Sequence, residues 1–343
     1  MLSKLFGWIL GRKPSSQGDD TSKKYFYVHE QGQKILRSTN NPDDLNKMEG
    51  KIRSNLNLHY RWSSDRDDIG KAAREELWAV QNVPDLPLVF MFHGDGRIRQ
   101  EALRNLKGPL PTSANVYGLS WRLNDWVPQV NQAAYGAFER TMPQTSAEVI
   151  VPALIAILPH INSWGRWPPE GPKAINSLLS RPDVAAKLLG LISTTREPRL
   201  GEIFRELSRN DWIDQHIHHV FLTAPLPHIR TMALDILLSQ RARWPTGKTV
   251  KVWIDRSMGQ YRTERVFCER KLSISANKIE LLSSGALDNS AMVRRRTADG
   301  LIALRHHRDL RDELDSIVGI LQNDPNIGVR NRVEFYVRKQ AET

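Results

Sequence analysis

The chain has 343 residues, of which 40% are hydrophobic and 25% are charged, a balance that excludes disorder over most of its length. Its single cysteine, Cys268, excludes an internal disulfide framework and a zinc site built from several thiolates. No apolar run approaches the roughly 18 residues of a membrane-spanning helix. We therefore expect a cytoplasmic protein. The net charge of +11 favours an anionic partner, which is nucleic acid, an anionic membrane surface or an acidic protein.

The first 13 residues predict a short amphipathic helix. Its apolar positions recur at helical spacing and share one face; they are Leu2, Leu5, Phe6, Ile9 and Leu10. Such a helix packs on its own domain or, alternatively, docks on a partner or on a membrane surface, which would make the protein a weakly bound peripheral one. Pro14 ends this helix, and we expect a polar linker over 14–24 before a helical domain over 25–343.

From about residue 60 onward, one pattern recurs along the chain. A β-branched residue is followed four positions later by a small or aliphatic residue and eight positions later by a hydrophobic one. The matches are Ile69/Ala73/Leu77, Ile98/Ala102/Leu106, Val130/Ala134/Phe138, Ile229/Ala233/Leu237, Val293/Thr297/Leu301 and Val329/Val333/Val337. Arg directly follows the first position in four matches, and Asp precedes it by three to five residues in five. Recurrence at about 30 to 40 residues is typical of stacked helical hairpins.

Stacking explains the residue types in this pattern. The small residue lets two helices approach closely, and the Asp is expected to be the N-cap of the following helix. We expect each Arg to pair with an Asp of an adjacent repeat. The stretches DGRIRQEALRNL, LPHIRTMALDIL and DNSAMVRRRTADGL resemble the HEAT-repeat family, whereas Gly70 and Asn131 stand where that family has its Arg. The resemblance implies an all-α fold, a right-handed α-solenoid of about six to eight HEAT-like hairpins.

Two stretches interrupt the helical pattern. Residues 162–173 are dense in Pro, Gly and Trp and predict a loop between helices. Residues 246–272 alternate with period two around 250–254 and again around 265–268, which predicts a small β-hairpin inserted into the solenoid.

Candidate catalytic and metal-binding residues have structural explanations. The histidine-rich segment 211–219 matches no known metal-binding spacing, so we interpret it as a solvated helix end and expect no metal and no cofactor. Cys268 has no nearby His in the sequence to activate it. The cluster from Trp121 to Trp126 is similar to the Trp- and Asp-lined surface of HEAT-like DNA glycosylases, but Asp125 fits the helix-cap position of a repeat. We therefore expect no catalytic residue, and glycosylase-like activity ranks third among the functions considered.

The basic segment 241–311 carries the main functional signal. It holds 16 Lys and Arg residues against 7 Asp and Glu residues, and its aromatic residues are interleaved with the basic ones. The candidate partner- or phosphate-binding residues are Lys248, Lys251, Arg256, Arg262, Arg265, Arg295 and Arg296. We expect a non-enzymatic binding scaffold that docks a macromolecular partner on its concave face and basic C-terminal half. A protein partner is the first expectation, nucleic acid is the alternative, and no small-molecule substrate is expected.

Overall fold

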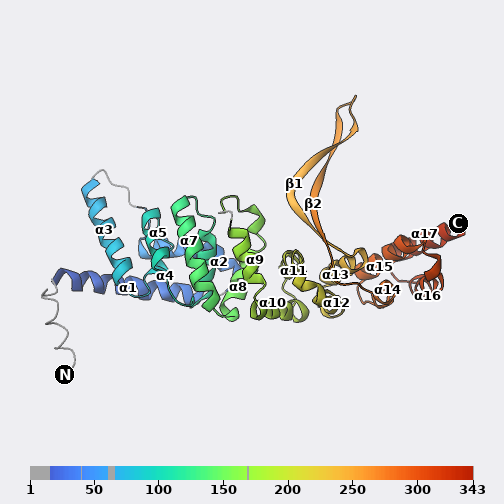
Figure 1. Cartoon of the computed structure of the whole chain (residues 1–343), viewed down its shortest axis with the longest axis horizontal. Coiled ribbons are helices and arrows are strands. Elements are labelled where there is room, and N and C mark those ends of the chain that lie inside the picture. The colour runs from blue at the N-terminus through green and yellow to red at the C-terminus, as the bar shows by residue number, and fades with distance from the viewer. Residues whose placement is uncertain (1–15, 40, 61–65, 168–169, 343) are drawn as a thin grey trace, which may run out of the picture. The chain divides into compact units, whose positions relative to one another are not determined.

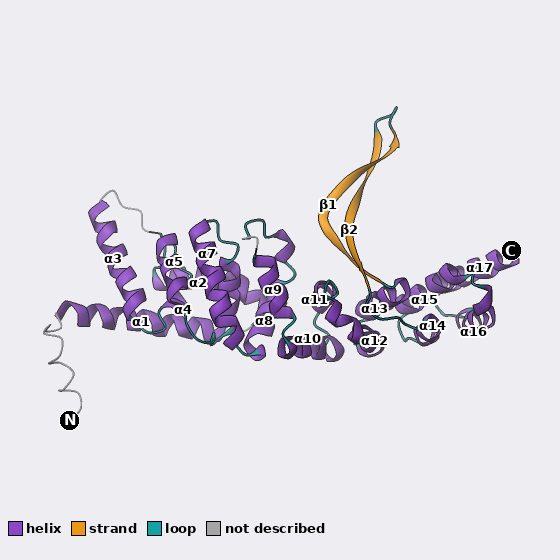
Figure 2. Ribbon diagram, viewed as in Figure 1, coloured by secondary structure: helices purple, strands orange, loops and turns teal. Residues whose placement is uncertain are grey.

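The computed structural model describes residues 16–39, 41–60, 66–167 and 170–342 (Figure 1). The helix expected over residues 1–13, with Leu2, Leu5, Phe6, Ile9 and Leu10, lies outside the described residues. The described chain is mostly helical, with one two-stranded antiparallel sheet (Figure 2). This confirms the all-α expectation with its small β insertion. The chain divides into two compact units, Met1–Leu178 and Leu179–Thr343, which are described separately.

The first unit is built from two sets of helices and a cover. Its helices are α1 (Ser16–Ser38), α2 (Pro42–Leu56), α3 (Arg66–Asn82), α4 (Pro87–Phe90), α5 (Gly96–Asn105), α6 (Ser113–Arg122), α7 (Pro128–Thr141), α8 (Ala147–Ile157) and α9 (Gly171–Leu179), with short 3₁₀ turns at Met142–Gln144 and Ile161–Ser163. Helices α3, α5 and α7 pack successively against one another, and α6 packs on α7 and α8. Helix α2 lies against both α6 and α8 and covers that pair of helices.

The second unit repeats a simpler two-layer arrangement. Its helices are α10 (Pro182–Thr194), α11 (Leu200–Leu207), α12 (Asp214–Thr223), α13 (Pro227–Ser239), α14 (Lys278–Ala286), α15 (Ala291–Leu304), α16 (Arg311–Leu321) and α17 (Ile327–Ala341), with 3₁₀ turns at Asp211–Ile213 and Arg308–Leu310. Helices α13, α15 and α17 form one layer, and α12, α14 and α16 contact that layer from the other side. Strands β1 (Arg241–Asp255) and β2 (Gln260–Lys271) leave this unit between α13 and α14 (Figure 1).

The recurring stripe forms the core of both units. Its middle positions, Ala102, Ala134, Ala233 and Thr297, have no exposed surface, as expected where helices approach closely. Its first positions are equally buried in α5, α7, α13, α15 and α17. In the described part of the chain the exceptions are Val337, half of whose surface is exposed, and Ala73 and Leu77 of α3, which are only partly buried. The pattern therefore predicts which helix faces pack inward.

Arginines of the stripe pair with aspartates of the next stripe. The Arg99 guanidinium donates to both carboxylate oxygens of Asp125, at 3.1 and 3.0 Å. Arg230 pairs in the same way with Asp288, at 2.7 and 2.8 Å. A third pair joins Arg294 to Asp324. The expected Arg–Asp pairing is thus present, with one such pair in the first unit and two in the second.

The aspartates cap their helices differently from the expectation. Among the aspartates of these matches that the structure describes, only Asp95 is an N-cap residue, accepting from the Arg97 amide at 2.8 Å, and Asp65 lies outside the described residues. Asp125, Asp288 and Asp324 lie two residues before the N-cap and accept from the amides of the N-cap residues, which are Val127, Ser290 and Asn326. The carboxylate closes a turn at the helix entrance, which also leaves both of its oxygens oriented toward the arginine of the preceding stripe.

Three boundaries differ from the expected ones. Helix α1 begins at Ser16, so the linker expected over 14–24 is wrong from residue 16 on. The polar first turns belong to a helix that packs on the core through the buried Tyr25 and Leu36. The hairpin expected over 246–272 begins earlier, at Arg241, because Pro245 is accommodated within β1 beside a register shift. The loop expected over 162–173 ends at Gly171, where α9 starts.

Candidate functional site

A two-stranded β-arm, residues 241–271, carries most of the predicted site residues. Strands β1 and β2 pair antiparallel from Arg241 opposite Lys271 to Asp255 opposite Gln260. Between Pro245 and Thr249 the register shifts, with Gly247 in the left-handed region at φ +77°. At about 3.3 Å per residue, the ten steps from Tyr261 to Lys271 extend roughly 33 Å. The arm projects from the helices of its unit (Figure 2).

The register assigns the charged side chains of the β-arm to two different faces. Residues directly opposite each other in an antiparallel pair share a face, and residues two apart on one strand do so as well. One face, called here the basic–aromatic face, carries Arg241, Arg243, Lys251, Trp253, Tyr261, Arg265, Phe267, Glu269 and Lys271. The opposite face carries Ala242, Trp244, Val250, Val252, Arg262, Glu264, Val266, Cys268 and Arg270. The first face therefore has five basic residues and one acidic residue.

Cations and rings alternate on the basic–aromatic face. The Lys251 ammonium lies 4.4 Å from the centroid of the Tyr261 ring, and the Trp253 ring meets Tyr261 edge to face at 5.5 Å. Nearer the base of the arm, the Arg243 guanidinium lies 5.2 Å from the Phe267 ring. Trp253, Tyr261 and Phe267 are each close to half exposed. Tyr261 and Phe267 thus each have a cation beside them, and all three rings have surface open to solvent.

Three predicted basic residues lie elsewhere on the arm. Arg262 is on the opposite face, where it forms an exposed ion pair with Glu264 at 2.6 Å. Lys248 lies in the register shift and Arg256 in the turn between the strands. Of the five arm residues predicted, the structure therefore brings only Lys251 and Arg265 together with the aromatic residues.

The turn at the tip of the arm is preorganised. The Asp255 carboxylate accepts from the Ser257 amide at 2.8 Å, from the Ser257 hydroxyl at 2.6 Å and from the Met258 amide at 3.2 Å. These hydrogen bonds lower the pKa of Asp255, with the Ser257 hydroxyl contributing most. Gly259 closes the turn at φ +66°, a conformation that glycine adopts without strain.

The base of the arm is clamped to the helices by one buried ion pair. Arg270 donates to Asp214 at 3.0 and 2.6 Å and to the carbonyls of Ser208 and Asn210. Ser273 donates to the same carboxylate through its amide and its hydroxyl. Burial by itself would raise the pKa of Asp214, but the hydrogen bonds from Arg270 and Ser273 outweigh it and lower the pKa. Asp214, considered above as a metal ligand, is thus the anchor of the arm.

Arg295 and Arg296 do not extend the basic–aromatic face. Arg296 of α15 donates to Asp235 of α13 at 2.7 Å, and Arg332 of α17 donates in the same way to Asp299 of α15 at 2.6 Å. These pairs form a second, half-exposed ladder beside the first one. Arg295 donates to the Ala291 carbonyl of its own helix at 3.3 Å.

The carboxylate of Asp125 is fully engaged. Its side chain is 1% exposed and accepts from Arg99, from Arg122 and from the Val127 amide. Burial would raise the pKa of Asp125, but Arg122 and the hydrogen bond from Arg99 lower it below the ordinary value of 3.8. A general base must be free to take a proton from its substrate. The geometry of Asp125 is that of a structural anion.

Comparisons with other proteins assign neither a family nor a function to the chain. No protein-family model matches the chain, and no curated protein matches it significantly. Within the described residues, no helix combines the length and the apolar character needed to cross a bilayer. The same part of the chain holds no group of three or more His, Cys, Asp or Glu residues placed to bind a metal.

Sequence reasoning missed part of the basic–aromatic face. Arg241 and Arg243 were not assigned to it, because the hairpin was expected to begin at residue 246, and Lys271, although inside the expected hairpin, was not among the candidate binding residues. The alternation of Arg241, Arg243 and Pro245 with less polar residues is a period-two signal that could have revealed the longer strand.

Proposed function

We propose that the protein is a non-enzymatic binding scaffold, a right-handed HEAT-like α-solenoid whose β-arm binds single-stranded nucleic acid. The observation that carries the proposal is the sorting of side chains by the register: five basic residues and three exposed aromatic rings share one face of the arm with a single acidic residue, Glu269. The HEAT-like assignment is supported by the buried stripes and by the Arg–Asp ladder.

The distribution of basic residues along the arm favours an extended polyanion that lies along the arm. The basic residues of the face run from Arg241 at the base to Lys251 in the distal half. A membrane surface that met the arm at its tip would be contacted by the distal residues alone. A nucleic-acid strand lying along the arm contacts all five, and each phosphate neutralised releases counterions.

The aromatic residues favour a single strand over a duplex. In a duplex the base faces are stacked on one another, whereas in a single strand they are available to protein rings. Tyr261 and Phe267 lie beside cations, so a base stacked on either ring brings its phosphate close to Lys251 or Arg243. This combination of rings and cations is the one that sequence-tolerant single-strand binding uses.

The proposal is tested by removing charge from one face at a time. We expect the triple variant Arg243→Ala, Lys251→Ala, Arg265→Ala to bind a fluorescein-labelled DNA strand of about 12 nucleotides some 10- to 100-fold more weakly than the native chain, measured by fluorescence anisotropy. The matched control is Lys248→Ala, Arg256→Ala, Arg262→Ala, which removes the same charge from the same arm outside the basic–aromatic face, and we expect a loss below about threefold.

Three outcomes would contradict the proposal. Equal losses in both triple variants would show that net charge alone attracts the strand. Retention of full affinity by the first variant would exclude the basic–aromatic face as the binding surface. Loss of an acidic protein partner, with nucleic-acid affinity unchanged, would assign the arm to protein docking instead.

A further inference from the structure

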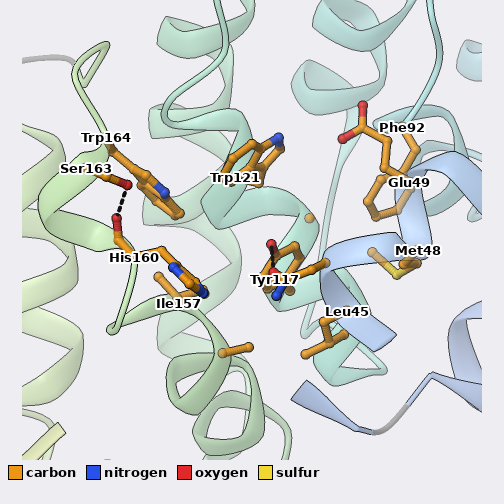
Figure 3. Close-up of a pocket in the computed structure, with 13 residues that line it drawn as sticks. Leu45, Met48, Glu49, Phe92, Tyr117, Trp121, Ile157, His160, Ser163 and Trp164 are labelled. Atoms are coloured by element: carbon orange, nitrogen blue, oxygen red, sulfur yellow. Dashed lines mark hydrogen bonds between the residues drawn. The ribbon is translucent and has the colours of Figure 1, made fainter. Parts of the chain in front are cut away.

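The first unit contains a pocket at some distance along the chain from the β-arm. It lies between α2, α6 and the end of α8, and its volume is about 370 Å³. Figure 3 shows Leu45, Met48 and Glu49 of α2 on one flank, Ile157, His160 and Trp164 on the other, and Trp121 and Tyr117 between them. The volume is at the lower end of the range of small-ligand sites, which begins at roughly 300 Å³. We call this site the aromatic pocket.

Three aromatic side chains form the wall of the aromatic pocket. Tyr117 and Trp121 are four residues apart on α6, and their rings are nearly parallel, with 6.4 Å between centroids. Trp164 meets Trp121 edge to face at 5.4 Å. Trp121 is 37% exposed, whereas Trp164 and Tyr117 are below 10%. The Trp121 ring is thus partly open to solvent, whereas Tyr117 and Trp164 are buried and fixed by packing.

A glycine in α6 gives the pocket its floor. A Cβ atom at Gly118 would lie 2.2 Å from the Phe92 ring, so only glycine at this position allows Phe92 to lie under α6. Phe92 itself is 1% exposed, and the apolar side chains of Leu45 and Ile157 on the two flanks have the same exposure.

The charged groups at the pocket are already neutralised. Glu49 forms ion pairs with Arg53 through one carboxylate oxygen and with Arg122 through the other. The Tyr117 hydroxyl donates to the Asn46 amide oxygen at 2.6 Å, and burial together with Glu49 raises the pKa of Tyr117 to about 12, so this hydroxyl stays protonated. A site for an ammonium group pairs aromatic faces with an available negative charge, and here that charge is taken by two arginines.

We infer that the aromatic pocket binds an uncharged, flat heteroaromatic ring of the nucleobase type. Aromatic faces favour a flat ring, and the neutralised Glu49 disfavours a cation. The polar groups at the rim, which include Asn46, Ser163 and His160, are few and suit the hydrogen-bonding edge of a base better than the many hydroxyls of a sugar. The base comes either from a free nucleoside or from an unpaired nucleotide of a strand. This inference stands on the pocket alone and does not depend on the function proposed for the β-arm.

The inference is tested by calorimetry with defined ligands. Adenosine and cytidine are the nucleoside probes, a DNA strand of about 12 nucleotides is the strand probe, and choline and glucose represent a cation and a sugar. We expect the native chain to bind at least one nucleoside or the strand, and to bind choline and glucose more weakly. Trp121→Ala should reduce that binding by about 5- to 150-fold, the effect of losing one base–aromatic stack.

Two further variants separate the pocket from a general loss of folding. Trp126→Ala removes a ring that is 71% exposed and does not line the pocket, and it should leave nucleoside binding unchanged. Asn46→Ala removes an exposed rim residue and the acceptor of the Tyr117 hydroxyl, and it should weaken the same binding several-fold while the helical circular dichroism stays that of the native chain.

The sources of the base and the possible failures are distinguished by the same titrations. Nucleoside binding that depends on Trp121 identifies a free ligand, whereas strand binding that depends on Trp121 without nucleoside binding identifies a base within a strand. The inference is overturned if neither probe binds, if choline or glucose binds more tightly than both nucleosides, or if binding survives both Trp121→Ala and Asn46→Ala. The triple variant of the β-arm should keep its nucleoside affinity, so failure of one proposal leaves the other intact.

Discussion

At the scale of single residues, one arginine geometry recurs along the chain. Arg99, Arg230 and Arg294 each donate to a carbonyl six residues earlier and, with the remaining edge of the guanidinium, to an aspartate of the next stripe. Arg330 keeps the backbone bond, to Asp324. Only a planar group with several fixed donors serves both partners at once, so lysine is not equivalent at these positions. The sequence revealed this role because Arg and Asp recur at fixed places relative to the stripe.

Asp125 provides the stability test at this scale. Asp125→Asn removes the anion that pairs with the buried Arg99 and leaves Arg122 with Glu49 alone, and we expect a loss of about 3 to 5 kcal/mol in the free energy of unfolding at pH 7. Chemical denaturation followed by circular dichroism measures this loss. Asp183→Asn, at a half-exposed pair with Arg181, is the control and should change stability by less than about 1 kcal/mol. If Asp125→Asn also lowered the free energy of unfolding by less than about 1 kcal/mol, the ladder would not be what holds the helices together.

The same variant has a defined pH dependence. The pKa of Asp125 is lower in the folded chain than in the unfolded chain, so the folded state is stabilised above the ordinary pKa of 3.8 and loses that stabilisation as the pH falls through the folded pKa. We expect the stability difference between the native chain and Asp125→Asn to be constant near neutral pH and to shrink below about pH 4. A difference that stayed constant to pH 3 would contradict the lowered pKa.

At the scale of elements, the β-arm shows where sequence reasoning stops. Period-two alternation near 250–254 and 265–268 predicted two strands, and two strands are present. The faces could not be predicted, because the register shift between Pro245 and Thr249 sets which residues of β1 share a face with those of β2. The register therefore places Lys251 of β1 on the same face as Arg265, whereas Arg262, three positions before Arg265 on β2, lies on the other face by strand alternation alone.

The anchor of the arm is testable by hydrogen exchange. Two strands without a packed face are marginally stable in water, so the arm depends on its base, where Ala242 is fully buried and Arg270 binds Asp214. Arg270→Ala should accelerate amide exchange in the base of β1 and β2 on the order of tenfold or more while leaving α15 and α17 protected. Arg262→Ala, which removes an exposed pair, should leave exchange unchanged. Unaltered exchange at the base in Arg270→Ala would refute the anchoring role.

At the scale of the whole molecule, the recurring stripe predicted helices but not every contact that covers them. Helices α13, α15 and α17 form the layer that the pattern implies. The packing of α2 on α6 and α8 has no counterpart in the pattern, since α2 belongs to no stripe, and the aromatic pocket arises at that contact. Trp121 and Trp164 are 43 positions apart in the sequence, so their meeting could not be read from spacing. Local periodicity reports the buried face of a helix, whereas a pocket depends on distant segments.

The most direct test of the central claim is the salt dependence of strand binding by the native chain. If all five basic residues of the basic–aromatic face contact phosphates, the logarithm of the association constant should fall with the logarithm of salt concentration with a slope of about −3.5. The variant Arg243→Ala, Lys251→Ala, Arg265→Ala should flatten that slope to about −1.4, because two contacts remain. The same slope in both proteins, or a native slope near zero, would contradict the claim that this face binds nucleic acid.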